Sequence, residues 1–227
     1  MKRTLLGLFL CMTLVALCTV GFAADKGRPG YAATVVDKAK AHPPVDQDGL
    51  TAFRLLFSNF GPDPTDLYDA SNGYFVSGPN NAFNGQMQDI AIPFKARANA
   101  NVVGIKYAVQ EYLELGAAGF KASLNADAGG LPGASLASAD VKIKISFGDP
   151  CCALTQWKLT TPVAVTKGTQ YWVVGTTDQK TNTAINTWSF VYNDAPGTFA
   201  FQQDNGGWIL LTAGYGYPPS AVAVYAQ

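Results

Sequence analysis

Short apolar or alternating stretches recur along the chain from Leu55 onward, separated by clusters of Gly, Pro, Asn and Asp. Stretches of this length that are rich in β-branched and aromatic residues are typical of β-strands, and the clusters between them are typical of turns. We expect strands at 55–59, 90–94, 102–109, 120–125, 141–146, 153–159, 163–165, 170–176, 187–192, 198–202, 208–211 and 221–225.

The clearest alternation is Val141, Ile143 and Ile145 against Lys142, Lys144 and Ser146, which predicts a strand with one face exposed to water. Just before it, Asp127, Gly129, Gly130, Pro132 and Gly133 form the strongest turn signal in the chain.

Ten or more strands in one chain must pack as two sheets or close into a barrel, because a single open sheet would expose a face and its edges. No long amphipathic helix is indicated. The sequence therefore predicts an all-β domain at residues 51–227, and we favour a two-sheet, jelly-roll-like β-sandwich.

The N-terminus has the pattern of a secretory signal peptide over residues 1–23. Lys2 and Arg3 precede an apolar run from Leu5 to Val20, and small residues stand at Gly21 and Ala23. The alternative is a membrane anchor, but the run is shorter than the roughly 20 residues that a span requires. We expect a secreted protein, extracellular or periplasmic, with no membrane span after cleavage. Residues 24–50 are polar and Pro-containing, which indicates a linker or loosely ordered arm.

The composition is typical of an exported β-domain and argues against nucleic acid as a partner. Only 14% of residues are charged and 12% are aromatic. Loss of Lys2 and Arg3 would leave a net charge of about −2, which gives no basis for binding nucleic acid.

Residues that commonly carry catalysis are scarce. His42 is the single histidine and precedes the predicted domain, so a histidine-based triad or zinc site is not indicated. Glu111 and Glu114 are the only glutamates, and they would point to opposite faces of a strand. We expect no enzyme; a carboxylate-based glycoside-active enzyme is the weaker alternative.

Calcium is the one ion for which the chain offers candidate ligands, and no other cofactor is indicated. Asp63, Asp66 and Asp69 recur every third residue, and Asp127 stands at the glycine turn. Neither segment is a complete calcium loop, and aspartates also favour turns without any ion.

Four aromatic residues are candidates for stacking on a ligand such as a sugar ring. Trp208 follows Asn205, Gly206 and Gly207 at a loop edge, and Tyr215 and Tyr217 lie between glycines and prolines. Trp172 alternates with Tyr171, so one of these two is expected to face outward or into the second sheet.

Several segments, taken in order, resemble one known family. They are LFSNFGP (56–62), YDASNGYFVSGPNNAF (68–83), DAGGLPGASL (127–136), FGDPCC (147–152), KGTQYWVV (167–174), the Trp strand at 187–190, and a final AVAVYA. This combination is similar to the choice-of-anchor R domain of bacterial exported proteins. The resemblance implies an exported β-sandwich with no established catalytic role.

Cys151 and Cys152 would be the whole cysteine complement after removal of the signal peptide. As neighbours they cannot join distant parts of the fold, and a bond between them closes a strained eight-membered ring. The family resemblance includes the pair, and export would let oxidation persist. We expect a vicinal disulfide that stiffens the turn, with free thiols as the alternative.

These observations together predict a secreted, non-catalytic module that binds or adheres to a glycan or cell-surface polymer. The alternative function is a structural surface or matrix component that acts through protein-protein contacts.

Overall fold

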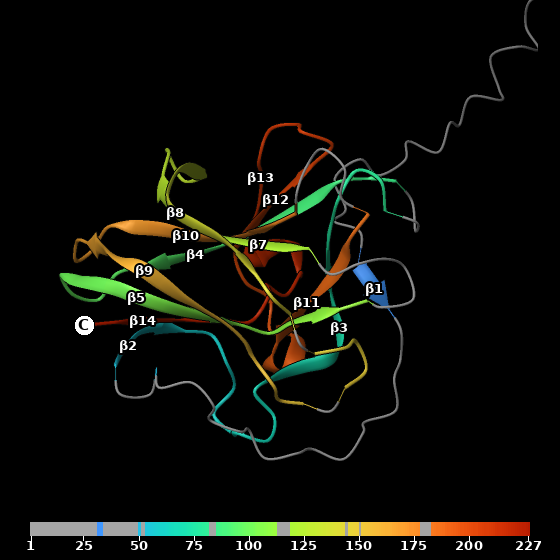
Figure 1. The fold of residues 1–227 in the computed structure, drawn as a ribbon, viewed down its shortest axis with the longest axis horizontal. Coiled ribbons are helices and arrows are strands. Elements are labelled where there is room, and N and C mark those ends of the chain that lie inside the picture. The colour runs from blue at the N-terminus through green and yellow to red at the C-terminus, as the bar shows by residue number, and fades with distance from the viewer. Residues whose placement is uncertain are drawn as a thin grey trace, which may run out of the picture.

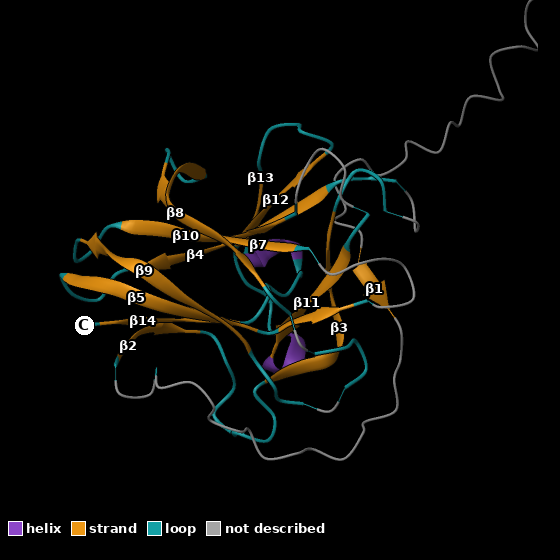
Figure 2. Cartoon of the chain, viewed as in Figure 1, coloured by secondary structure: helices purple, strands orange, loops and turns teal. Residues whose placement is uncertain are grey.

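A computed structural model describes residues 31–33, 50, 53–81, 85–112, 119–143, 145–149, 151–177 and 183–227. Within them the chain forms two sheets that face each other in two layers (Figure 1). Strands dominate, and short 3-10 turns occur only between them (Figure 2). No helix in the described ranges has the length and apolar character needed to cross a membrane.

The larger sheet has a central run of seven strands. Their order is β6 (Val109–Glu111), β11 (Ile185–Val191), β3 (Tyr68–Ser77), β4 (Gln88–Lys95), β10 (Gln170–Thr176), β7 (Phe120–Asp127) and β8 (Pro132–Val141). Three further strands are β1 (Tyr31–Ala33) beside β3, β12 (Phe199–Gln203) beside β4, and β13 (Ile209–Leu211) beside β12. In Figure 1 β12 and β13 rise above the rest of this sheet.

The smaller sheet has four strands in the order β2 (Arg54–Ser58), β14 (Val222–Ala226), β5 (Ala100–Tyr107) and β9 (Thr155–Val165). The last strand in the chain, β14, is therefore paired on both sides. All strand pairs in the described ranges are antiparallel. The chain crosses between the layers several times, and the predicted all-β, two-sheet sandwich is confirmed.

Alternating side chains divide each strand between the core and the opposite face of its sheet. In β4, Ile90, Ile92 and Phe94 belong to the main core. Because successive side chains point to opposite faces, Asp89 and Ala91 lie on the face that turns away from the smaller sheet. We call this side of the larger sheet the outer face.

Three aromatic rings join the layers at the centre of the core. Tyr107 comes from the smaller sheet, and Phe120 and Trp188 come from the larger sheet. The Tyr107 ring centroid lies 5.3 Å from each of the other two, with edge-to-face geometry. The indole Nε1 of Trp188 donates a 2.8 Å hydrogen bond to the carbonyl oxygen of Ala221, immediately before β14.

The turn predicted at residues 127–133 is confirmed and connects β7 to β8. Gly129 and Gly130 adopt φ values of 69° and 90°, which favour glycine. The Gly130 N–H donates to Asp127 Oδ2 at 3.0 Å.

The strand predicted at residues 141–146 is wrong, because β8 ends at Val141. Ile143 and Ile145 are nevertheless buried. The alternation therefore predicts the burial of Ile143 and Ile145 correctly, but no strand forms because β8 stops pairing with β7 at Val141. The backbone carbonyl of Ile145 instead accepts a 2.7 Å hydrogen bond from Glu111 N–H, at the end of β6.

Two long strands, β3 and β8, escape the sequence pattern. β8 is rich in Ala and Ser, whose small side chains give no clear alternation. β3 begins with the polar run YDASNG and has a register shift opposite β11. Strand pairing compensates for their weak local preference, since β3 pairs along most of its length with β11, which is distant in sequence, and β8 pairs with β7.

The predicted signal peptide at residues 1–23 lies outside the described residues, as does most of the predicted arm at 24–50. Two parts of the arm are described. One is β1, and the other is Leu50, a buried residue whose methyl groups fill the space that a Cβ on Gly104 would occupy.

Gly175 on β10 provides a test of the central aromatic packing. A Cβ at this position would lie 2.7 Å from Phe120 Cε2 and 3.0 Å from Trp188 Cζ3. We expect Gly175→Ala to lower the free energy of unfolding by about 1–3 kcal/mol because buried rings have no room to shift. Gly207→Ala is the control, since a Cβ there meets no atom within 4 Å. Urea unfolding should place the control within about 0.5 kcal/mol of the parent, and equal effects of both changes would contradict the packing argument.

Candidate functional site

Trp172 does not offer a face to a ligand, which corrects the prediction for this residue. Its side chain is 0% exposed, and its Nε1 donates a 2.8 Å hydrogen bond to Asp127 Oδ1. As the alternation predicted, Trp172 and Tyr171 point to opposite sides of the strand, and Trp172 lies on the outer face of the sheet. Additional side chains then cover that face, which the sequence pattern did not reveal.

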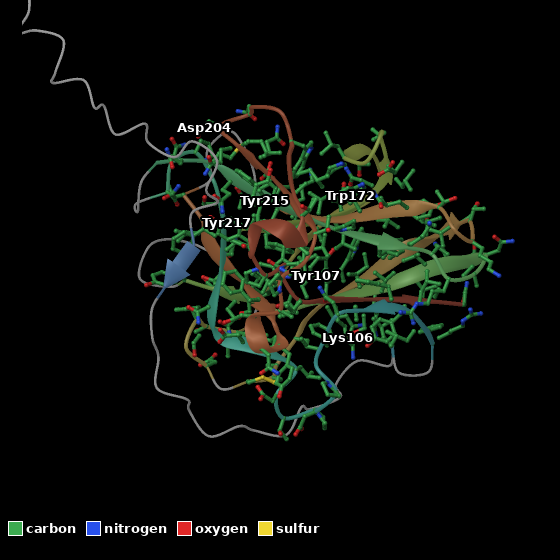
Figure 3. All side chains as sticks on the ribbon, turned by 180° about the vertical axis from the view of Figure 1, so that it is seen from behind. Lys106, Tyr107, Trp172, Asp204, Tyr215 and Tyr217 are labelled. Atoms are coloured by element: carbon green, nitrogen blue, oxygen red, sulfur yellow. A yellow bond between two sulfur atoms is a disulfide. The ribbon has the colours of Figure 1, made fainter. Side chains whose placement is uncertain are left out.

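The outer face carries a second small apolar cluster, separate from the main core. Ala91 of β4, Trp172 and Val174 of β10, and Ala200 of β12 form its buried part. Leu131, from the β7–β8 turn, and Trp208, from the β12–β13 turn, pack against these residues. Figure 3 labels Trp172 among the side chains of this region.

The chain from Trp208 to Tyr215 presents apolar side chains to solvent. Trp208 is only partly buried, Leu210 is 39% exposed and Ile209 is 41% exposed. Tyr215 ends the short 3-10 turn η3 (Ala213–Tyr215) and is 65% exposed. We call Trp208, Ile209, Leu210 and Tyr215 together the hairpin surface; Ile209 and Leu210, as neighbours on β13, point to opposite sides of that strand.

Tyr217, the fourth predicted stacking residue, has a different position from Tyr215. It is partly buried and packs against the main core. Figure 3 labels both tyrosines, which belong to the segment between β13 and β14. Of the four candidates, Tyr215 is the most exposed, Trp208 and Tyr217 are both partly buried, and Trp172 is fully buried.

Asp89 lies on the outer face of the larger sheet, on the same side of β4 as Ala91. It is a strand residue of β4 and is only 3% exposed. Its Oδ1 atom is buried and has no hydrogen-bond partner. An acidic residue within the apolar segment DIAIPF was the signal that could have identified it.

Burial raises the pKa of Asp89 to about 6, and a hydrogen bond from Thr176 opposes the shift in part. The Thr176 hydroxyl also lies 3.2 Å from the carbonyl oxygen of Thr177, so its one proton is shared between two acceptors. Gln202 pairs with Asp89 across the strands, but its Nε2 donates to the carbonyl oxygen of Gly206. This bond uses one of the two Nε2 protons of Gln202.

Two of the aspartates proposed as calcium ligands, Asp63 and Asp69, accept hydrogen bonds from residues close to them in sequence. Asp63 Oδ1 accepts from Thr65 N and Oγ1, both at 2.8 Å, and these bonds lower the pKa of Asp63. Asp66 lies in the same turn and donates its backbone N–H to the carbonyl oxygen of Asp63. Asp69 accepts from Ser71 N–H and from an amide side chain.

Asp127 is likewise engaged, because its carboxylate accepts from Trp172, Gln170 and Gly130. These bonds, led by the one from Trp172, lower its pKa. The four aspartates do not converge. Nowhere in the described ranges do three or more His, Cys, Asp or Glu side chains gather as a metal-binding group.

The fold also brings together two carboxyl groups that are distant in sequence. Asp194, in η2 (Tyr192–Asp194), lies beside Asp69 of β3. Burial first, and then the neighbouring Asp69 carboxylate, raise the pKa of Asp194 to about 6. Glu111 ends β6, whereas Glu114 and His42 lie outside the described residues.

The predicted vicinal disulfide between Cys151 and Cys152 is confirmed. Figure 3 draws it as a bond between two sulfur atoms. Cys152 is buried in a cluster with Tyr68, Ala108 and Val191, and its Sγ accepts a 3.0 Å hydrogen bond from Leu67 N–H. The Tyr68 hydroxyl donates to the carbonyl oxygen of Ala153 at 2.9 Å. The pair therefore fastens its loop to the start of β3.

Comparisons of the chain with protein-family models and with curated proteins found no match. The resemblance to the choice-of-anchor R domain stays a prediction.

The buried Asp89 carboxyl predicts how stability depends on pH. The folded protein binds this proton more tightly than the unfolded chain, whose aspartate pKa is 3.8. The protonated Asp89 carboxyl therefore contributes its full share to the free energy of unfolding below pH 4. This share, on the order of 3 kcal/mol, is lost as pH rises through 6. Asp89→Asn should raise the free energy of unfolding at pH 7.5, and the gain should shrink toward pH 4. Because Asp194 titrates in both proteins, the difference between their urea curves isolates Asp89. A less stable variant at pH 7.5 would contradict this prediction.

The state of the cysteine pair can be read by intact mass. Alkylation of the unfolded protein without reductant should add no label, and alkylation after reduction should add two. Reduction should lower the free energy of unfolding by only about 1 kcal/mol, because the shortest loop constrains the unfolded chain least. Two labels without reductant would show free thiols.

Proposed function

We propose that this chain is a secreted, non-catalytic binding module that attaches to a glycan or cell-surface polymer through the hairpin surface. The observation that carries the proposal is the concentration of exposed apolar side chains between Trp208 and Tyr215. Sugar rings present apolar C–H faces that stack on aromatic side chains, while their hydroxyl groups require polar partners nearby.

The architecture supports a binding surface at this place. Trp208 packs against the buried outer-face cluster around Trp172, which supports it on the protein side. Tyr215 is held by a turn in which its N–H donates to the carbonyl oxygen of Thr212 at 3.0 Å. A preorganised ring loses little conformational entropy when a ligand binds.

The alternative function is a structural component that binds other proteins or copies of itself. The exposed side chains of Phe53 and Leu55 near β2, an edge strand of the smaller sheet, favour this alternative. Unpaired strand edges with apolar side chains can recruit a further strand.

A binding experiment with two matched variants separates the functions. Wild-type protein is tested on a glycan array and by pull-down on insoluble chitin, cellulose and xylan. Tyr215→Ala should weaken binding about five-fold, because contact with an aromatic face contributes about 1 kcal/mol. Phe53→Ala removes an exposed ring directly before β2 of the smaller sheet and should leave binding unchanged.

Absence of any glycan signal at high protein concentration would contradict the proposal. Concentration-dependent self-association in size-exclusion chromatography that Phe53→Ala abolishes and Tyr215→Ala leaves unchanged would favour the structural alternative.

A further inference from the structure

The strongest unexplained group outside the hairpin surface is the Asp89 carboxyl on the outer face. Its Oδ1 is buried without a hydrogen-bond partner, although a carboxylate buried in this way normally has one or more donors. Thr176 shares its one hydroxyl proton between Asp89 and the Thr177 carbonyl oxygen, and Gln202, which pairs with Asp89 across the strands, donates to the Gly206 carbonyl oxygen.

Asp89 lies directly next to the residues that support Trp208. Ala91, two positions along β4, is in the apolar cluster on which Trp208 packs. Side chains two apart on a strand share a face and lie about 7 Å apart. Ala91 also pairs with Ala200 of β12, and Asp89 pairs with Gln202 of the same strand. The unpaired acceptor is thus adjacent to the support of the hairpin surface.

We propose that Asp89 is the polar anchor of the same ligand site, where its Oδ1 accepts a hydrogen bond from a hydroxyl group of a neutral sugar whose ring contacts Trp208. This proposal rests on the proposed function and adds to it the residue that recognises the hydroxyl group. A hydroxyl donor to a carboxylate makes a short, charge-assisted bond, which is stronger than a bond between neutral groups.

Asp89 is 3% exposed, so a ligand reaches its carboxylate only if the residues around it move, and the turn between β12 and β13 is the nearby segment that contains glycines. Gly206 and Gly207 precede Trp208, and a Cβ at Gly207 would meet no atom within 4 Å. Two successive glycines allow the backbone to reorient with little steric cost. Asp204 meanwhile keeps the turn attached to β4, since its Oδ1 accepts from Met87 N–H at 3.0 Å.

The protein alone stabilises the Asp89 carboxylate poorly, and a ligand hydroxyl group would supply the hydrogen-bond donor that Oδ1 lacks. Burial without enough donors raises the pKa of Asp89. An asparagine of the same shape would relieve this cost, so the carboxylate at this position opposes stability and favours recognition.

Isothermal titration with soluble hexaoses of chitin, cellulose and xylan tests the proposal. Wild-type protein should bind at least one of them, and Asp89→Asn should weaken that binding by at least about ten-fold. Asp140→Asn is the matched control, because it removes the same charge from an exposed position on β8 of the same sheet. It should bind within two-fold of wild type. Circular dichroism and urea unfolding should show that Asp89→Asn is folded and at least as stable as wild type, so that lost binding is not lost structure.

The outcomes separate this inference from the proposed function. If Tyr215→Ala weakens binding and Asp89→Asn does not, the hairpin surface binds the sugar and the role of Asp89 is wrong. If none of the hexaoses binds, the proposed function and this inference both fail. Tighter binding of cationic glucosamine oligomers than of neutral sugars would overturn the assigned ligand class, because the anchor would then pair with a cation.

Discussion

The contact among Tyr107, Phe120 and Trp188 is the interaction on which the sandwich depends. Each ring is buried, and together they bridge the two sheets with edge-to-face geometry. Trp188 adds a directional constraint, because its indole N–H bonds to the Ala221 carbonyl oxygen at the entrance to β14. The Ser220 hydroxyl returns a bond to the Trp188 carbonyl oxygen. The edge-to-face ring contacts and these hydrogen bonds thus set the position of β14, the last strand, between β2 and β5.

The outer face of the larger sheet takes no part in this packing between the sheets. In a two-layer sandwich such a face commonly meets water, yet here Trp172 and Val174 are buried on it beneath Leu131 and Trp208. The β7–β8 and β12–β13 turns supply this cover. Because the second cluster is small and close to solvent, a turn that contains glycines can rearrange there without disturbing the main core. A ligand site at this place would combine the buried cluster around Trp172, as its support, with the glycine-containing β12–β13 turn at its edge.

The disulfide loop is a third, local unit of the structure. It joins residues that are neighbours in sequence, so it adds little to the connectivity of the chain. Its effect comes from what the sulfur atoms contact, since Cys152 fills a buried space beside Tyr68 and Val191 and accepts the Leu67 N–H. The loop thereby attaches the segment before β9 to the start of β3, two regions that share no strand pairing. A local covalent bond in this way supports a long-range contact.

The sequence by itself determined the all-β class, many of the strand positions and the turn at Gly129 and Gly130, because these depend on local periodicity and backbone preference. It also indicated that Trp172 turns away from Tyr171. Only the tertiary structure decided that Trp172 is buried, since its cover comes from Leu131 and Trp208, which are distant in the chain. The same holds for Asp89, whose burial and unpaired oxygen depend on side chains from other strands, and for Asp194 beside Asp69. Alternation along one strand shows which way a side chain points, but what it meets there is set by strands and turns that the pattern does not connect.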